Sequence, residues 1–245
     1  MKVAILFSGG KDSSYAIESC LEKGWKIAYL LSVKPTRKDC YLFHYATVEH
    51  TPLQAKLMGL RHILTTCDVA DPTAEAKLVR EIVESMQKKE KIEALVLGGT
   101  GLQLTQLRSI QKALQPLGIS VFAAHEGREH GELMKEMLDK GYVFMITQVA
   151  SEGLGKWLGS IVTKENFAAL LRDAHKYGFH IGFEGGYADT FCLDSPLFAK
   201  KIDILEMEKC MEDELSGHIV FKKFMLSDKS VVGSAHTANL TLAIH

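Results

Sequence analysis

Residues 2–14 read KVAILFSGGKDSS. The apolar run 2–7 has the length and continuous hydrophobicity of a buried strand in a parallel sheet, and a helical period begins near Asp12. Between them, Gly9 and Gly10 let backbone N–H groups approach a ligand closely, and a helix N-terminus at the same place attracts anions. The stretch therefore predicts a strand, a phosphate-binding loop and a helix. The alternative is a plain strand-to-helix turn in which the glycines serve geometry alone.

This loop fails the tests for two common nucleotide motifs. The Walker A pattern G-x-x-x-x-G-K-[ST] requires a hydroxyl residue after the lysine, but Asp12 follows Lys11, and Ile5 occupies the first glycine position. The dinucleotide pattern G-x-G-x-x-G fails because Gly9 and Gly10 are adjacent. An aspartate beside phosphate is repelled unless a divalent cation lies between them, so Asp12 predicts bound Mg²⁺.

Strand-like and helix-like segments alternate along the first half of the chain. Strands are expected over 2–7, 25–33, 62–66, 92–99 and 119–124, and helices over 12–24, 51–60, 71–91 and 102–118. This alternation predicts an α/β fold whose five-stranded, doubly wound parallel sheet occupies residues 1–125. Because ligands bind at the carboxyl ends of parallel strands, the loops after the first, second and fourth strands are the expected site.

After residue 125 the pattern changes to that of a smaller α+β domain over 126–245. Helices are expected over 131–141 and 163–178, strands over 142–150, 199–208 and 217–228, and a glycine-containing loop over 179–198. Thr163 is the expected N-cap of the second helix. No long linker separates the halves, so an interface between them is expected.

The composition restricts the classes of function. The chain has 29 Lys+Arg and 30 Asp+Glu residues, a balance that gives no basic field strong enough to hold nucleic acid. No apolar run reaches the roughly 18 residues of a membrane span. The five cysteines form no C-x-x-C pair, which predicts reduced thiols and a cytoplasmic location. The oligomeric state stays open, a homodimer included.

The stretch HEGREH at 125–130 nearly matches the zinc-protease pattern H-E-x-x-H. Its histidines, His125 and His130, are five positions apart, which on a helix separates them by about 140°. Gly127 also weakens a helix at this point. The stretch therefore predicts no zinc site.

The motif SGGKDS at 8–13 resembles the PP-loop of the ATP pyrophosphatases, which cleave ATP to AMP and pyrophosphate. Three further stretches resemble one branch of that group, the diphthine–ammonia ligase family: DCYLFHYATVEHTPLQAKLMGL at 39–60, SEGLGKWLGSIV at 151–162 and FEGGYADTFCLDSPLF at 183–198. The resemblance implies a HUP-like fold that uses ATP and Mg²⁺. It also implies amidation of diphthine, a modified histidine of elongation factor 2, with ammonium as the nitrogen source.

The resemblance, together with the strand ends, assigns candidate roles to individual residues. Tyr41 and His44 match a family Tyr-x-x-His pattern. The nucleotide-binding candidates are Ser8, Gly9, Gly10, Lys11, Asp12, Ser13, Ser32, His44, Gly98 and Gly99, with Asp12 as the metal ligand. The catalytic candidates are Lys11, Asp12, Glu184 and Asp189, of which the last two belong to the acceptor or ammonia side.

The chain departs from the family pattern mainly on that acceptor side. Phe183, Tyr187, Ala188 and Asp189 stand where the family has Gly, Glu, Tyr and Glu. After the fourth strand, Gln103, Thr105 and Gln106 replace a Ser-x-Tyr-Gln pattern, a shifted Arg108 is the one arginine nearby, and Ala124-His125 replaces Leu-Trp. Two alternatives therefore stay open beside diphthine amidation: a ligase for another carboxylate, such as a cobalamin precursor, and an ATP-binding module without turnover. A tRNA thiolase is disfavoured, because paired cysteines and a basic surface are missing.

Overall fold

The computed structural model describes residues 1–40 and 42–229. Tyr41 lies outside the described residues, as does the segment 230–245. The first half contains β1 (Lys2–Leu6), α1 (Lys11–Glu22), β2 (Lys26–Pro35), α2 (Thr51–Leu57), β3 (His62–Cys67), α3 (Pro72–Gln87), β4 (Ala94–Leu97), α4 (Leu104–Leu114) and β5 (Ser120–Ala123). Short 3₁₀ turns occupy Val48–His50, Gln115–Leu117 and, later in the chain, Gly155–Trp157.

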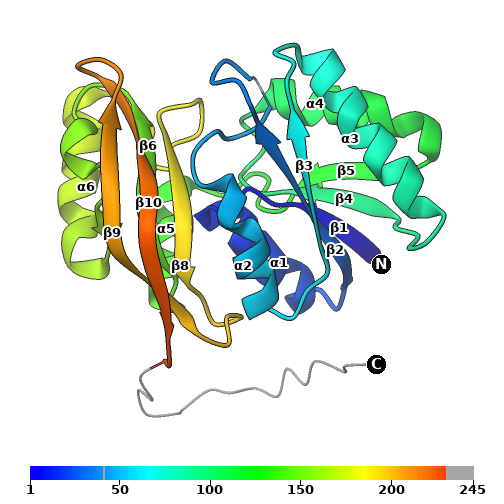
Figure 1. The fold of residues 1–245 in the computed structure, drawn as a ribbon, viewed down its shortest axis with the longest axis horizontal. Coiled ribbons are helices and arrows are strands. Elements are labelled where there is room, and N and C mark those ends of the chain that lie inside the picture. The colour runs from blue at the N-terminus through cyan, green and yellow to red at the C-terminus, as the bar shows by residue number, and fades with distance from the viewer. Residues whose placement is uncertain (41, 230–245) are drawn as a thin grey trace.

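The five strands of the first half form one parallel sheet in the order β3-β2-β1-β4-β5. Helices α1 and α2 cover one face of this sheet, and α3 and α4 cover the other (Figure 1). The predicted doubly wound α/β architecture is confirmed.

The central strand β1 is buried on both faces. Val3 and Ile5 pack under α1 and α2, whereas Ala4 packs under α3, and all three are fully shielded from solvent. Alternate side chains of a strand point to opposite faces, so a strand between two helical layers must be apolar on both. This explains the uninterrupted apolar run that precedes the SGGKDS loop.

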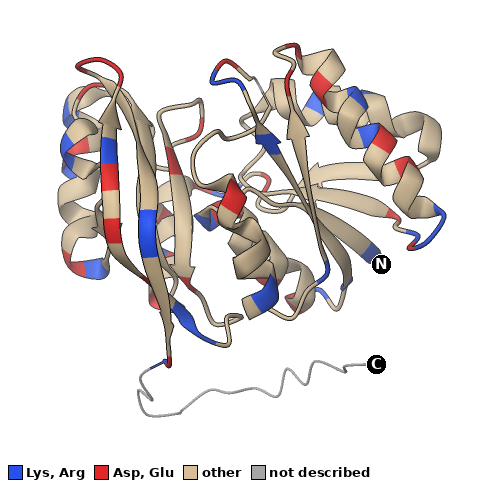
Figure 2. Ribbon diagram, viewed as in Figure 1, with Lys and Arg blue, Asp and Glu red and all other residues tan. Residues whose placement is uncertain are grey.

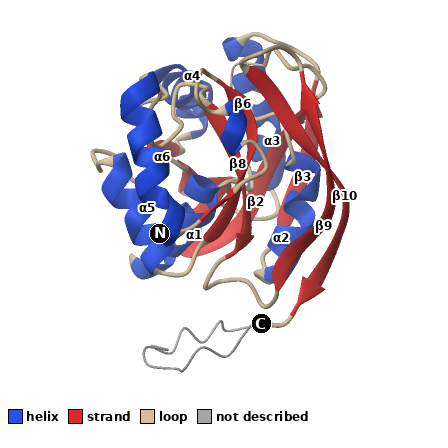
Figure 3. Ribbon diagram, turned by 90° about the vertical axis from the view of Figure 1, so that its left-hand side faces the viewer, coloured by secondary structure: helices blue, strands red, loops and turns tan. Residues whose placement is uncertain are grey.

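The second half forms an antiparallel sheet with two helices. Its elements are α5 (His130–Asp139), β6 (Val143–Ala150), β7 (Ile161–Val162), α6 (Lys164–Tyr177), β8 (Ala188–Asp194), β9 (Lys201–Met211) and β10 (Ser216–Ser227). The strand order is β7-β6-β10-β9, and β8 pairs with β6. Helices α5 and α6 lie together on one side of this sheet (Figure 3). Thr163 caps α6 as expected, in a capping box with Asn166.

The sequence predicts a loop over 179–198, but this prediction is wrong for residues 188–194, which form strand β8. Four of its residues, Thr190 to Leu193, are buried in succession, so the strand shows no alternation of polar and apolar residues. Gly185 and Gly186, both with positive φ, precede the strand, and these glycines favour a loop when the sequence is considered alone. This correction moves Asp189 from a loop onto a strand.

The two sheets share a hydrophobic core. One continuous cluster joins β1 and α1 of the first half to α5, β6 and β8 of the second. The expected interface between the halves is therefore extensive, and it brings β8 against the start of α1. All five cysteines carry free thiols.

Charges of both signs are interspersed along the elements, as α3 and β9 illustrate in Figure 2. Within the described part of the chain, no helix is long and apolar enough to cross a membrane.

Candidate active site

A pocket of about 890 Å³, counted out to its open mouth, lies at the carboxyl ends of β1, β2 and β4. The first half contributes Phe7, Ser8, Gly10, Lys11, Asp12, Ser13, Leu42, Phe43, His44, Gly98, Gly99 and Gly101, among others, and the second contributes Gly182, Phe183, Glu184, Ala188 and Thr190. The pocket lies at the sheet edge where the sequence placed the site.

The SGGKDS loop is held in shape by its own serines. Ser13 Oγ lies 3.1 Å from Ser8 Oγ, accepts a hydrogen bond from Ser8 N at 3.2 Å and donates to Gly10 O at 3.2 Å. Gly10 is the N-cap residue of α1 and provides no side-chain cap. The N-terminus of a twelve-residue helix therefore faces the pocket without a capping side chain of its own.

Strand β8 of the second half binds this loop directly. Cys192 N donates to Gly9 O at 2.8 Å, and Lys11 N donates to Thr190 Oγ1 at 3.1 Å. The buried Gln54 of α2 bonds both the loop and β8, since its Nε2 donates to Gly9 O at 2.9 Å and to Cys192 O at 2.8 Å. Gly9 is required here, because its φ is +82° and a Cβ would lie 2.5 Å from Gln54 Oε1.

Lys11 and Asp12 form a pair at the floor of the pocket. The Lys11 ammonium is almost fully buried and donates to Asp12 Oδ2 at 2.6 Å and to Gly182 O at 2.7 Å. It also lies 5.3 Å from the centre of the Phe183 ring. Asp12 Oδ1 is shielded from solvent and has no hydrogen-bond partner among the described residues. An unpaired carboxylate oxygen in a pocket suits a bound cation.

Glu184 reaches the pocket from the segment before β8. Its Oε1 accepts from Thr100 N at 2.7 Å and from Thr100 Oγ1 at 3.2 Å, and lies 2.7 Å from His130 Nε2. Burial opposes ionisation, but the donors from His130 and Thr100 outweigh it and lower the pKa of the Glu184 carboxyl to about 2. Glu184 is therefore a buried anion held by two residues.

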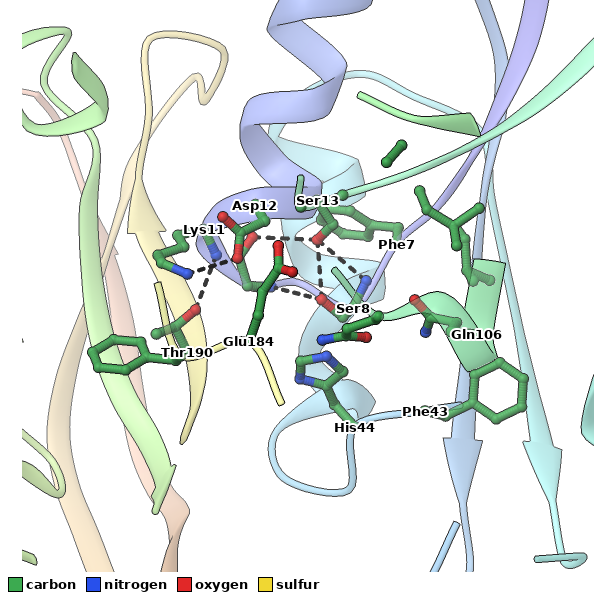
Figure 4. Close-up of a pocket in the computed structure, with 18 of the residues that line it drawn as sticks. Phe7, Ser8, Lys11, Asp12, Ser13, Phe43, His44, Gln106, Glu184 and Thr190 are labelled. Carbon is green, nitrogen blue, oxygen red and sulfur yellow. Dashed lines mark hydrogen bonds and ion pairs between the residues drawn. The ribbon is translucent and has the colours of Figure 1, made fainter. Parts of the chain in front are cut away.

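His44 and Asp189 form a charged contact between the halves. His44 Nδ1, on the loop after β2, lies 2.6 Å from Asp189 Oδ1 on β8. Burial disfavours the protonated imidazole, but the Asp189 carboxylate outweighs this effect and raises the pKa of His44. Figure 4 shows His44 on the other side of Ser8 from Asp12.

The two glycines after β4 allow close approach of protein groups. A Cβ on Gly98 would lie 2.6 Å from Ser13 N and 2.8 Å from the Asp12 carbonyl carbon, so Gly98 lets β4 pack against the start of α1. Gly99 has a φ of +80°, and its Cβ would lie 2.6 Å from Glu184 Oε1. Both line the pocket, and together they join the loop to Glu184.

Comparison with known proteins shows the family of this chain. A family model described as the diphthamide synthase N-terminal domain matches residues 1–120, and one described as the diphthamide synthase C-terminal domain matches residues 129–226. The chain belongs to the diphthine–ammonia ligase (diphthamide synthase) family. The resemblance of the sequence motifs to this family is confirmed.

Curated relatives of the family align along most of the chain. The diphthine–ammonia ligase of Homo sapiens is 29% identical over 270 residues, covering 98% of each protein. That of Mus musculus is 30% identical and covers 86% of this chain and 85% of its own. A solved structure, a predicted subunit of tRNA methyltransferase from Methanocaldococcus jannaschii, is 17% identical, with a TM-score of 0.40 over 59% of this chain and 77% of its own.

Most of the candidate site residues come together at the pocket, but Ser32, which was expected there from the end of the second strand, does not. Its side chain is fully buried away from the pocket, where Oγ donates to Phe7 O at 2.5 Å and lies 2.8 Å from His62 Nε2. The next residue, Val33, lines the pocket instead, because neighbouring strand residues face opposite sides. Ser32 therefore links the end of β1 to β3, and its side chain does not reach the nucleotide pocket.

Only some of the residues that depart from the family pattern line the pocket. Gln103 and Gln106 line the pocket, whereas Arg108 is exposed on α4 and does not. Phe43 and Gln106 lie across Ser8 from Lys11 and Asp12 (Figure 4). Phe43 belongs to one apolar cluster with Val33, Leu97 and Leu107, which gives the pocket an apolar end, and Gln106 adds an amide group to the lining.

The histidines of HEGREH take separate roles. His125 stacks on Tyr15 with ring centres 5.0 Å apart, and burial lowers its pKa to about 4. His130 instead contacts Glu184 and Thr100. Within residues 1–40 and 42–229, no group of three or more His, Cys, Asp or Glu side chains is placed to hold a metal ion. The contact of His130 with Glu184 could not be found from the sequence, because the two residues are 54 positions apart and meet only in the folded chain.

Proposed function

We propose that this protein is an ATP-dependent ligase that amidates diphthine on elongation factor 2, releasing AMP and pyrophosphate. One observation supports this function above all: β8 and the segment bearing Glu184 close over the same pocket as the SGGKDS loop. A nucleotide and an acceptor group bound there would lie side by side. Family membership supports diphthine as the acceptor, since the curated relatives are diphthine–ammonia ligases.

Each half of the chain would hold one of these partners. Residues 1–125 would bind ATP, with pyrophosphate against Ser8, Gly10 and Ser13 and the base at the apolar end near Phe43. The phosphates would meet the N-terminus of α1, where the N-cap residue Gly10 has no side chain and backbone dipoles favour negative charge. Residues 126–245 would bind the acceptor, with Asp189 and His44 at its edge.

The residues present fit a magnesium ion beside the phosphates. Lys11 is already neutralised by Asp12, so little positive charge remains to balance a bound triphosphate. Asp12 Oδ1 has no partner among the described residues and would hold the ion. Magnesium bound there would supply charge neutralisation of the departing pyrophosphate.

The reaction requires activation of the acceptor, because a carboxylate repels nucleophiles and oxide is a poor leaving group. Attack of a carboxylate oxygen on the α-phosphorus of ATP forms an acyl adenylate and breaks the bond to pyrophosphate. Ammonia then adds to the acyl carbon, AMP leaves with the bonding electron pair, and one proton is released from the nitrogen. The protein contributes positioning and charge stabilisation.

The test is to incubate the protein with ATP, MgCl₂, ammonium chloride and diphthine-bearing elongation factor 2. We expect AMP to form in step with the acid-to-amide mass change on the factor. Asp12→Ala should abolish pyrophosphate release and leave the circular dichroism spectrum unchanged. If wild-type protein binds ATP but forms no AMP with this factor, diphthine amidation is refuted.

A second candidate is a ligase for a different carboxylate. Phe183 and Ala188, which replace the family's Gly and Tyr, both line the pocket and change its shape on the acceptor side. AMP formation with a panel of small carboxylates, but not with the factor, would favour this candidate. Tight ATP binding without AMP formation on any acceptor would indicate a binding module.

A further inference from the structure

Two carboxylate oxygens in the pocket lack a hydrogen-bond donor within the described part of the chain. They are Asp12 Oδ1 and Glu184 Oε2, and both are shielded from solvent. The Glu184 side chain is only 5% exposed. In each group the other oxygen is fully engaged: Asp12 Oδ2 accepts from Lys11, and Glu184 Oε1 accepts from Thr100 and contacts His130.

Leaving such an oxygen without a partner is costly. A buried acceptor without a donor loses the hydrogen bonds it makes to water in the unfolded chain, and the loss is larger when the acceptor carries charge. A cation between the two oxygens would relieve the cost at both.

Packing brings the two carboxylates to the same wall of the pocket. Gly98 touches the backbone of Asp12, and the next residue, Gly99, touches the Glu184 carboxylate. The Lys11 ammonium contacts both Asp12 Oδ2 and the carbonyl of Gly182, which lies two residues before Glu184. Figure 4 shows the Glu184 side chain directed toward Asp12 and Ser13.

We propose that Asp12 Oδ1 and Glu184 Oε2 together bind one divalent cation, so that each half of the chain supplies one ligand. This inference rests on the proposed function for the identity of the ion as Mg²⁺. Magnesium in nucleotide sites is held by one or two carboxylates, and water and phosphate oxygens fill the remaining positions.

In this site, His130 and Thr100 are positioning residues. They occupy Oε1 of Glu184 and thereby direct Oε2 toward the ion, as groups behind a metal ligand commonly do. The assignment moves Glu184 from the acceptor side to the nucleotide side. Asp189, whose Oδ1 contacts His44, stays on the acceptor side. The ion would also link the second half of the chain to the SGGKDS loop.

The test uses Mn²⁺ alone as the probe, with its affinity for the nucleotide-free full chain measured by electron paramagnetic resonance. We expect Asp12→Asn and Glu184→Gln each to weaken Mn²⁺ binding at least about tenfold. The matched control Asp189→Asn removes a nearby carboxylate that is not a ligand, and should leave the Mn²⁺ affinity within about twofold. Because both carboxylates hold one ion, the double variant should lose much less than the product of the two single losses.

Unchanged Mn²⁺ affinity in Glu184→Gln, or strictly additive losses in the double variant, would overturn the shared site. If either variant fails to fold, anomalous scattering from wild-type crystals soaked in Mn²⁺ decides the question. A peak between the two carboxylates supports the proposal, and a peak on Asp12 alone, or no peak at all, overturns it. Mn²⁺ binding at both residues without AMP formation would refute the ligase function and leave the cation site standing.

Discussion

His44 Nδ1 lies 2.6 Å from Asp189 Oδ1, and this pair joins the loop after β2 to strand β8 at the pocket. The two residues come from opposite halves of the chain. Their contact supplements the backbone hydrogen bond from Cys192 N to Gly9 O. The pocket therefore depends on an interface between the halves as well as on the sheet of the first half.

The His44–Asp189 pair should make stability depend on pH. The pKa of His44 is raised in the folded protein, so its contribution is fully present below the unfolded pKa of about 6.5 and is lost as pH rises through the folded value. Urea unfolding of wild type and Asp189→Asn should differ by about 1 kcal/mol at pH 6, a modest value for a partly solvated pair. The difference should shrink by pH 9. A gap that stays constant from pH 6 to pH 9 would contradict this role for the pair.

Gln54 should couple stability to nucleotide binding. Gln54→Leu removes the donor shared by Gly9 O and Cys192 O, and leaves two buried carbonyls short of a hydrogen bond. We expect a loss of about 2–4 kcal/mol in the free energy of unfolding, together with weaker ATP binding measured by calorimetry.

The matched control for Gln54 is Gln87→Leu. Gln87 also bonds backbone groups, at Ile92 N and Ile92 O, but does so at the end of α3, away from the pocket. This control should lower stability and leave ATP affinity unchanged. Equal losses of ATP affinity in the two variants would show that Gln54 acts through global stability alone.

How far the sequence predicts this site depends on how local each feature is. The strand, glycines and helix of residues 2–14 are adjacent in the chain, so the SGGKDS loop could be recognised directly. The pairing of β8 with that loop joins segments far apart in sequence, and no local pattern encodes it. Ser32 shows a different limit. The sequence locates the end of this strand, but it does not show whether Ser32 or Val33 faces the pocket, because a shift of one residue turns the side chains to the opposite face.

Gly99→Ala should disturb Glu184 in addition to straining the backbone. Gly99 has a φ of +80°, and a Cβ there would lie 2.6 Å from Glu184 Oε1. Backbone strain alone costs about 1 kcal/mol or more, and displacement of a buried carboxylate adds to it, so we expect a total loss of about 2–4 kcal/mol on chemical denaturation.

Gly118→Ala is the control for the cost of backbone strain alone. Gly118 has a φ of +68°, but its Cβ would meet no atom within 4 Å. This variant should lose only about 1 kcal/mol and should retain the Mn²⁺ affinity of wild type, whereas Gly99→Ala should not. Equal effects of the two substitutions on stability and on Mn²⁺ binding would argue against the contact between Gly99 and Glu184.

Phe183 should show a compensation between backbone strain and packing. It has a φ of +65°, a conformation that among the described non-glycine residues only Thr47 shares. It stands where the family has glycine, yet its ring is buried and lies near the Lys11 ammonium. Phe183→Gly would lose core packing worth about 3–5 kcal/mol and regain about 1–2 kcal/mol of strain.

The matched control is Phe179, which is equally buried, lies 6.5 Å away between ring centres and has no positive φ. Phe179→Gly should therefore cost about 1–2 kcal/mol more than Phe183→Gly in urea unfolding. If Phe183→Gly costs as much as Phe179→Gly, no strain is stored beside Glu184, and the phenylalanine acts there through packing alone.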